Sequence, residues 1–218
     1  MNPFHFRGSY LRNLPHLQPR GATLFITYRL AGSLPRSLIR QFRKERAWLL
    51  HLAETNPVHF DFVRADFERL WFAKFERVLD GGAVGPTWLR DDRVAALVAQ
   101  SLRDRDGKLY RLHAFSIMPN HVHTVLTPMR LAQTKESETL EVQYHSLASI
   151  MQGLKGCAAF EANQVLSRKG EFWAHESYDH WIRDAEEWKR IVAYVLHNPV
   201  KARYVKHWQD WKWSYRRN

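Results

Sequence analysis

The sequence predicts a single α+β domain in which helices pack on an antiparallel sheet, and three observations support this. The 218 residues are enough to bury a sizeable hydrophobic core. Two segments with strand composition flank residues 118–120, Met-Pro-Asn, which is the pattern of a hairpin. Helical periodicities lie on both sides of this hairpin, and no repeat or long linker divides the chain.

The N-terminal half contains one predicted strand and three predicted helices. Residues 1–21 are basic and are interrupted by three prolines. Residues 23–30 are rich in β-branched and aromatic side chains, which favours a strand. Helical patterns follow over 35–54 and 59–79, and after a glycine-rich break another is predicted over 90–103.

The C-terminal half contains the predicted hairpin and two further helices. Strands are predicted over 109–118 and 121–127, followed by a polar loop over 129–141. A long helix over 143–166 is indicated by apolar residues spaced i, i+3, i+4 and i+7, and another helix is predicted over 184–198. These strands are fewer than a complete sheet requires.

The most informative pattern is the pair His121 and His123 at the start of the second hairpin strand. Side chains alternate along a strand, so both imidazoles point to the same face. Two imidazoles on a rigid backbone supply two ligands of a divalent metal site. The alternative is a pair of half-buried histidines with no function.

The helix over 184–198 has clear boundary signals. Asp184 and Glu187 form a capping pair at its start. Its apolar stripe consists of Trp188, Ile191, Val192 and Val195. Pro199 disfavours helical geometry in the preceding residue, which predicts that the helix ends at Asn198.

The same helix brings a second pair of polar residues together. At about 100° per residue, Tyr194 and Asn198 lie about 40° apart on one flank of the apolar stripe. His197 falls on the opposite side, toward solvent. Tyr194 and Asn198 therefore suit the lining of a cleft, while the alternative is a boundary tyrosine followed by an asparagine that stops the helix.

Composition indicates a polyanionic partner. The chain has 33 Lys and Arg against 22 Asp and Glu, a formal net charge of +11, and its pI is near 10. Binding to phosphates with release of counterions gives basic proteins affinity for nucleic acid. Aromatic residues are abundant and can stack on unpaired bases, although a generally basic soluble surface is the alternative.

Several sequence features that are absent restrict the cellular compartment and the kinds of site that we expect. Cys157 is the single cysteine, which permits neither an intramolecular disulfide nor a cysteine-rich zinc site and fits a reducing compartment. The sequence has neither an apolar run long enough to span a bilayer nor a signal-peptide pattern. It also lacks a glycine-rich phosphate loop followed by Lys-Ser or Lys-Thr, which argues against nucleotide hydrolysis. We therefore expect a cytoplasmic protein without membrane association.

Taken together, these motifs resemble the REP-associated tyrosine transposases, which belong to the His-hydrophobe-His single-strand DNA transposases with one catalytic tyrosine. The resemblance runs in order from about Pro15 to Trp213. The segments that carry it are Met-Pro-Asn-His-Val-His at 118–123, Phe172-Trp173, Tyr178-Asp179, Ile182-Arg183-Asp184, and Tyr-Val-Leu-His-Asn-Pro-Val-Lys-Ala at 194–202.

The resemblance implies a site and a fold. His121 and His123 would be metal ligands, Tyr194 the nucleophile, and Asn198 the third metal ligand one helical turn later. The implied fold is a ferredoxin-like antiparallel sheet with helices packed on it. Against that pattern, residues 59–105 are predicted to be a helical insertion and residues 206–218 a basic aromatic tail of the single catalytic domain 1–218.

The implied reaction is the cleavage and rejoining of single-stranded DNA beside a hairpin. Tyr194 would attack the phosphate, forming a 5′-phosphotyrosine and freeing a 3′ hydroxyl. The implied cofactor is Mg²⁺ or Mn²⁺, although histidine ligation would also accept Zn²⁺. The implied partner is single-stranded or hairpin DNA, and we favour a monomer.

Further residues are candidates for DNA contact rather than for chemistry: Lys155, Trp173, Tyr178, Arg183, Lys201 and Lys212. Two alternatives to the transposase-like enzyme stay open. One is a non-catalytic DNA-binding protein with the same fold. The other is a metal-dependent nuclease that uses water, in which Tyr194 would be unnecessary.

Overall fold

The protein folds around a five-stranded antiparallel sheet. The computed structural model describes residues 20–56, 72–81, 85–131 and 142–218. The strands are β1 (Leu24–Leu30), β2 (Tyr110–Ile117), β3 (His121–Pro128), β4 (Trp173–Trp181) and β5 (Ser214–Arg216). Their spatial order is β4-β1-β3-β2-β5, and each neighbouring pair is antiparallel.

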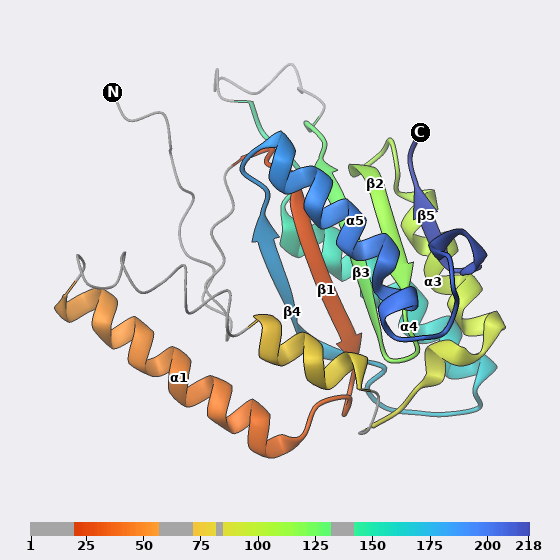
Figure 1. Ribbon diagram of the computed structural model, residues 1–218, viewed down its shortest axis with the longest axis horizontal. Helices are drawn as coiled ribbons and strands as arrows, with labels where there is room; N and C mark the ends of the chain where they lie inside the picture. Colours follow the sequence, from red (N-terminus) through yellow and green to blue (C-terminus); the bar gives the residue numbers. More distant parts are fainter. Residues whose placement is uncertain (1–19, 57–71, 82–84, 132–141) are drawn as a thin grey trace.

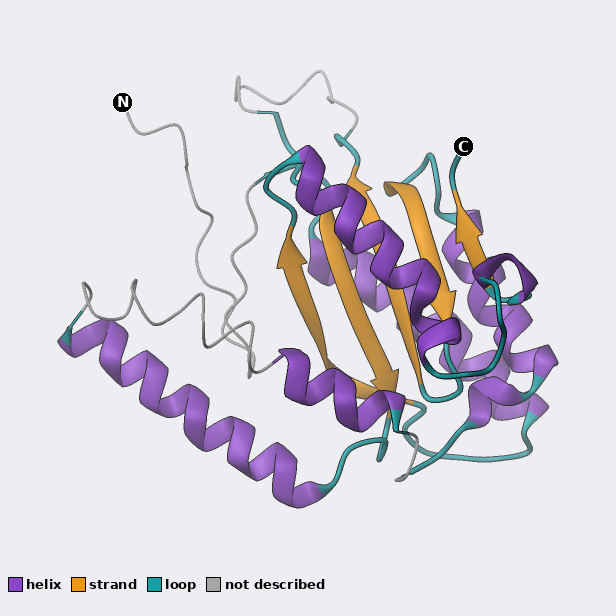
Figure 2. Cartoon of the chain, viewed as in Figure 1, coloured by secondary structure: helices purple, strands orange, loops and turns teal. Residues whose placement is uncertain are grey.

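Helices cover both faces of this sheet (Figure 1). The α-helices include α1 (Arg36–Thr55), α3 (Asp92–Asp104), α4 (Leu147–Val165) and α5 (Ala185–Lys201). Two short 3₁₀ helices are η1 (Trp88–Arg90) and η2 (Trp208–Asp210). Residues 72–80 form a further helix. In Figure 2, α3 and α4 lie behind the sheet, while α5 and the helix at 72–80 lie in front.

This arrangement confirms the predicted α+β class and its ferredoxin-like topology. The chain runs from β1 through helices to the hairpin β2-β3, then through α4 to β4, and these strands take the order β4-β1-β3-β2. The helix α3, which lies inside the range predicted as an insertion, packs with α4 on the sheet. β5 extends the sheet beside β2.

Of the three hydrophobic cores among the described residues, two lie on opposite faces of the sheet because strand residues alternate between faces. The larger core, behind the sheet, includes Ile26 of β1, Leu112 of β2 and Leu154 of α4. The smaller core lies under α5 and includes Phe25 and Val125. Consecutive residues of β1 therefore belong to different cores, and the sheet separates the side of α3 and α4 from the side of α5.

The strand predictions are confirmed, but they were incomplete. The predicted strands at 23–30, 109–118 and 121–127 correspond to β1, β2 and β3. The sequence did not predict β4 and β5. β4 is the edge strand beside β1 and carries Ala174, His175 and Glu176 without regular polar and apolar alternation. β5 has only three residues.

Two helix boundaries differ from the prediction. α4 begins at Leu147 because the Ser146 side chain accepts a hydrogen bond from the Ser149 N–H and caps the helix there. α5 continues past Asn198 to Lys201, with Pro199 inside it. The prediction that Pro199 ends the helix was wrong, because Pro199 removes one backbone donor in the last turn while its own carbonyl accepts from the Tyr204 N–H.

The remaining helix predictions correspond to α1, α3 and residues 72–80. The predictions for residues 1–19, 57–71 and 132–141 lie outside the described residues. Among the described helices, none combines the length and apolar character that a bilayer span requires.

Candidate metal centre and active site

The two histidines begin β3 and lie on the sheet face covered by α5. β1 pairs with this strand so that Thr27 is opposite His123 and Arg29 is opposite His121. Both histidines are fully buried. Their Nε2 atoms are 2.9 Å apart, as the shared strand face predicts.

Hydrogen bonds to the other ring nitrogens orient the imidazoles. His121 Nδ1 lies 2.7 Å from Asn120 Oδ1, which can only accept, so Nδ1 carries the proton. Asn120 is itself held because its Nδ2 donates to the Leu79 carbonyl at 3.0 Å. His123 Nδ1 lies 2.8 Å from the Thr27 hydroxyl. These partners direct both Nε2 atoms toward the same space, as the partners of metal-ligating histidines do.

Two carboxylates from residues 72–80 approach the same Nε2 atoms. Glu76 Oε2 lies 3.2 Å from His123 Nε2, and Asp80 Oδ1 lies 4.0 Å from His121 Nε2. Ligand atoms of these four residues all lie within 4.8 Å of one another. Glu76 is buried and Asp80 is half-buried. The group is thus able to hold a divalent ion with mixed nitrogen and oxygen ligands.

Sequence reasoning missed Glu76 and Asp80. The spacing of these two residues was a usable signal, since residues at i and i+4 of a helix share one face. Their neighbours Phe75 and Leu79 are buried. This face of residues 72–80 is therefore turned toward the protein. An acidic pair on such a face indicates a buried use for its charges.

The unsatisfied oxygens of the site test whether a cation fits it. Glu76 Oε1, Asp80 Oδ1 and Asn198 Oδ1 are buried and have no hydrogen-bond partner among the described residues. Buried polar atoms without partners are rare in folded proteins. With His121 Nε2 unprotonated, the Glu76 and Asp80 oxygens offer lone pairs that a divalent cation would satisfy, so the residues fit the metal that the resemblance implies.

Tyr194 and Asn198 complete the site from α5, as their helical phase predicts. Asn198 Nδ2 lies 3.2 Å from His123 Nε2 and 3.4 Å from the Tyr194 hydroxyl. A 180° rotation of the amide would place Oδ1 there instead, in the position of a metal ligand. The Tyr194 hydroxyl donates a hydrogen bond to Glu76 Oε2. His197 is exposed on the opposite side, as predicted.

Burial and charge shift the pKa values of the site residues. Burial, reinforced by His123, lowers the pKa of His121 to about 3, so its ring is neutral. Burial and the charge of Glu76 raise the pKa of Tyr194 well above its usual value. Burial would raise the pKa of Glu76, but the adjacent His123 outweighs it and the pKa is lowered. These shifts favour a neutral Tyr194 against an ionised Glu76.

The predicted DNA-binding residues lie in different environments, and three of them are engaged inside the protein. Lys155 donates to the Ala174 and His175 carbonyls at 3.0 and 3.2 Å. Trp173 is buried and packs edge-on against Tyr28, so it is not available for stacking on a base. Tyr178 is half-buried and stacks on Phe72, with ring centroids 4.6 Å apart.

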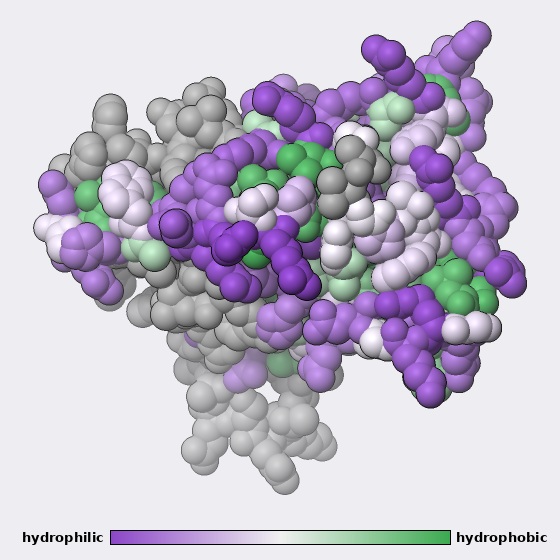
Figure 3. Space-filling model, turned by 90° about the horizontal axis from the view of Figure 1, so that it is seen from below, coloured by the Kyte–Doolittle hydropathy of each residue, from purple (hydrophilic) through white to green (hydrophobic). Residues whose placement is uncertain are grey.

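The other three are at the surface. Lys201 lies beside the candidate site, 2.6 Å from Asp80 Oδ2 and above the Tyr194 ring. Arg183 is exposed before α5. Lys212 is exposed and ion-paired with Asp92 at 2.9 Å. Figure 3 shows the molecule from below, where hydrophilic side chains are interspersed with pale and apolar ones.

A curated protein is similar to part of this chain. The chain is 29% identical over 101 residues to "Putative REP-associated tyrosine transposase" from Haemophilus influenzae strain Rd. The match covers 46% of this chain and 56% of that protein, so the chain spans little more than half the length of the curated relative. That relative bears the name of the family that the sequence motifs resemble, which confirms the resemblance.

A solved structure is also similar. "Structure of the REP associates tyrosine transposase bound to a REP hairpin" has 18% sequence identity and a TM-score of 0.47, and the alignment covers 94% of this chain and 82% of that chain. No protein-family model matches the chain.

Proposed function

We propose that this protein is a metal-dependent transposase that cleaves and rejoins single-stranded DNA beside a hairpin, with Tyr194 as the nucleophile. One observation carries the proposal. The Tyr194 hydroxyl bonds to Glu76 and Asn198, and both of these residues also lie within 3.2 Å of His123 Nε2, beside His121. A DNA-binding protein without catalysis has no need of such a buried, charged arrangement, and the name of the curated relative supports the same class.

The metal would be held by His121, His123, Glu76 and Asp80, with Asn198 as a further oxygen ligand. Nitrogen and oxygen ligands together suit Mn²⁺, and Mg²⁺ is the alternative. When bound, the ion acts as a Lewis acid that stabilises negative charge on the scissile phosphate. The hydrogen bonds of the imidazoles with Asn120 and Thr27 fix the two rings in advance.

The chain's own residues would carry the covalent step. The Tyr194 oxygen forms a bond to phosphorus while the bond from phosphorus to the 3′ oxygen breaks. Tyr194 loses its hydroxyl proton and the leaving 3′ oxygen gains one, so the proton count is unchanged. Glu76 Oε2 already accepts the hydrogen bond from Tyr194 and is placed to receive its proton. The reverse step, with another 3′ hydroxyl, rejoins DNA.

Affinity for DNA would come from the charge of the whole chain and from residues at the rim. The formal net charge of +11 favours binding to a polyanion. Lys201 Nζ lies 5.7 Å from the centre of the Tyr194 ring, and Arg183 is a further exposed candidate. We propose that these cations contact the phosphates of the strand.

An adduct assay tests the proposal. The purified protein is incubated with end-labelled hairpin DNA carrying single-stranded flanks, with Mn²⁺, with Mg²⁺ or with excess chelator, and is then analysed on a denaturing gel. We expect a covalent protein–DNA band with metal and none with chelator. Cleavage without an adduct would indicate a nuclease that uses water. Binding without cleavage under all metal conditions would indicate a non-catalytic DNA-binding protein.

A further inference from the structure

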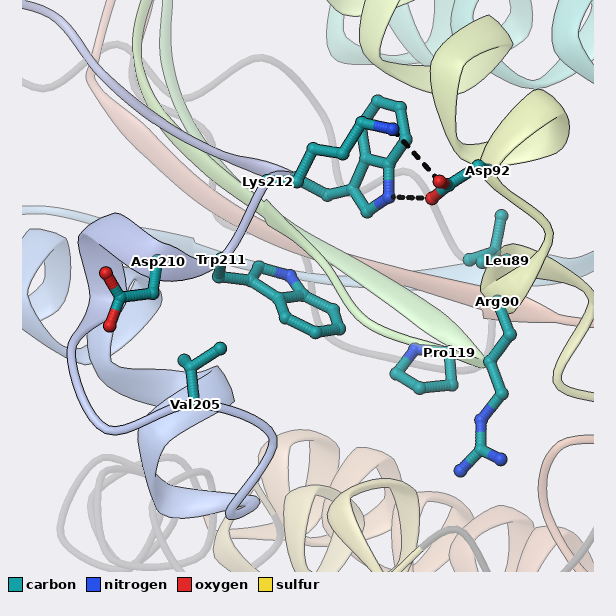
Figure 4. A pocket seen from close by; sticks show the side chains of 9 residues that line it. Leu89, Arg90, Asp92, Pro119, Val205, Asp210, Trp211 and Lys212 are labelled. Carbon is teal, nitrogen blue, oxygen red and sulfur yellow. Dashed lines mark hydrogen bonds and ion pairs between the residues drawn. The ribbon is translucent and has the colours of Figure 1, made fainter.

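A pocket next to the candidate site is formed by segments far apart in the sequence. It has a volume of about 260 Å³ and is lined by Leu89, Arg90, Asp92, Pro119, Val205, Asp210, Trp211, Lys212 and Trp213. Sites for drug-sized ligands span about 300–1,000 Å³. This pocket is smaller, which suits a single planar ring system. Figure 4 shows Trp211 between Val205 and Pro119, with Arg90 on the Pro119 side.

The aromatic wall of the pocket is fixed in place. Trp211 Nε1 donates to the Ile117 carbonyl at 3.0 Å. Tyr204 stacks on Trp211, with ring centroids 5.4 Å apart and an interplanar angle of 24°. Trp213 Nε1 donates to Asp92, which also binds Lys212, as the dashed lines in Figure 4 mark. The ring surfaces are therefore oriented before any ligand enters.

The charges around the pocket favour a nucleotide. Asp92 and Lys212 neutralise each other, while Arg90 is exposed and has no carboxylate partner among the described residues. Asp210 lies on the far side of Trp211 from Arg90, and its carboxylate points away from the indole (Figure 4). Arg90 is thus able to bind a phosphate at the rim while the apolar walls take the attached base.

The turn between β2 and β3 connects the wall of the pocket to the candidate active site. Pro119 forms one wall and its carbonyl accepts from the Leu89 N–H at 3.2 Å. Met118 N–H donates to the His121 carbonyl at 2.8 Å across the same turn. Pro119 precedes His121 by two residues, so their Cα atoms are at most about 7.6 Å apart. A strand whose phosphate lies at the site can place a neighbouring nucleotide here.

We infer that this pocket binds one unpaired nucleobase of the single-stranded flank, with Arg90 on its phosphate. The inference rests on the proposed function and adds a recognition site to it. It predicts that one flank position contributes to affinity through its base as well as its phosphate. Because the base stacks on an aromatic ring, removing it should weaken binding about tenfold, which corresponds to about 1.4 kcal/mol.

The test combines abasic DNA with pocket variants. Hairpin DNA is prepared with an abasic site at each flank position in turn, and Kd is measured by fluorescence anisotropy at one salt concentration. Wild type should lose about tenfold in affinity at one position or two adjacent positions. Val205→Phe fills the pocket and Arg90→Gln removes the rim charge. In Val205→Phe this loss should fall below about twofold, and in Arg90→Gln intact DNA should bind more weakly.

Arg111→Gln is the matched control, because Arg111 is exposed at the start of β2, at the other end of that strand from Pro119. It should leave the abasic profile unchanged. Each variant is first checked for an unchanged circular dichroism spectrum. A wild-type profile without a sensitive position, or one that Val205→Phe does not alter, would overturn the pocket assignment and leave the proposed function standing. No binding of hairpin DNA by wild type would overturn both.

Discussion

The Tyr194 hydroxyl and the Glu76 carboxylate are joined by a hydrogen bond across 118 positions of the sequence. The same carboxylate lies 3.2 Å from His123 Nε2. Glu76 therefore links the candidate nucleophile to the candidate metal ligands, and residues 72–80 form part of the site rather than an appendage to the sheet.

Tyr194→Phe should abolish the covalent adduct while the protein still folds and binds DNA and metal. The substitution removes a single oxygen atom at the margin of the smaller core. Without added metal, loss of the hydrogen bond to Glu76 should lower the free energy of unfolding by about 1.5–3 kcal/mol, the range for hydrogen bonds to charged groups. The adduct is measured on a denaturing gel and stability by urea unfolding.

Tyr178→Phe is the matched control for that experiment. Tyr178 and Tyr194 both contact Phe25 and Phe72, but it is the Tyr194 hydroxyl that bonds to Glu76 and Asn198 beside the histidines. It should retain the adduct. If Tyr194→Phe cleaves DNA at nearly the wild-type rate, water is the attacking group and the proposed mechanism is wrong.

Asn120→Ala should weaken metal binding by about 10–100-fold, because Asn120 orients His121 and residues 72–80 without itself being a ligand. Affinity for Mn²⁺ is measured by calorimetry with the metal alone. Asn163→Ala is a suitable control, since Asn163 bonds the Gly170 carbonyl at a distance from the site in sequence and fold. Equal affinities of both variants and wild type would show that the imidazoles do not need this support.

The shared face of His121 and His123 could be predicted from the sequence because side chains alternate along a strand. The proximity of Tyr194 and Asn198 could be predicted because residues four apart lie on one face of a helix. Glu76 and Asp80 could not be assigned a role in this way. Their proximity to His121 depends on how residues 72–80 pack against the sheet, and local periodicity does not specify such packing. β4 was missed because its side chains vary in burial along the strand, so no clean alternation appears.

Glu187→Gln should destabilise the protein near pH 7 by about 0.3–1 kcal/mol, the range for a negative charge at a helix N-terminus. Glu187 Oε2 accepts from the Arg183 N–H, and Glu187 N–H donates to Asp184, which confirms the predicted capping pair. Burial raises the pKa of Glu187, but these hydrogen bonds and His180 outweigh it and leave the pKa lowered.

The sign of the pH dependence follows from that lowered pKa. The carboxylate stabilises the fold above the pKa of the unfolded chain, and this stabilisation is lost as pH falls through the lower pKa of the folded state. Urea unfolding at pH 7 and at about pH 3 should therefore show a smaller difference between wild type and Glu187→Gln at the acidic pH. A difference that grows on acidification would contradict the prediction.

Leu112→Ala should lower the free energy of unfolding by about 2–5 kcal/mol, because Leu112 is fully buried in the larger core. Leu131→Ala, at a side chain 38% exposed, should change it by less than about 0.5 kcal/mol. Below its unfolding temperature, Leu112→Ala should still form the adduct, because Leu112 packs in the core opposite α5. Loss of the adduct in a folded Leu112→Ala protein would show that the two faces are coupled.

β3 serves both faces at once, since Val122 and Leu126 pack in the larger core while His121 and His123 face α5. Because the side chains of β3 alternate between the two faces, a substitution at the candidate metal ligands would leave the larger core intact. A descendant in which His121 or His123 is replaced would keep its sheet and its basic surface. A single codon change could therefore remove the proposed activity and leave a folded protein of the same net charge.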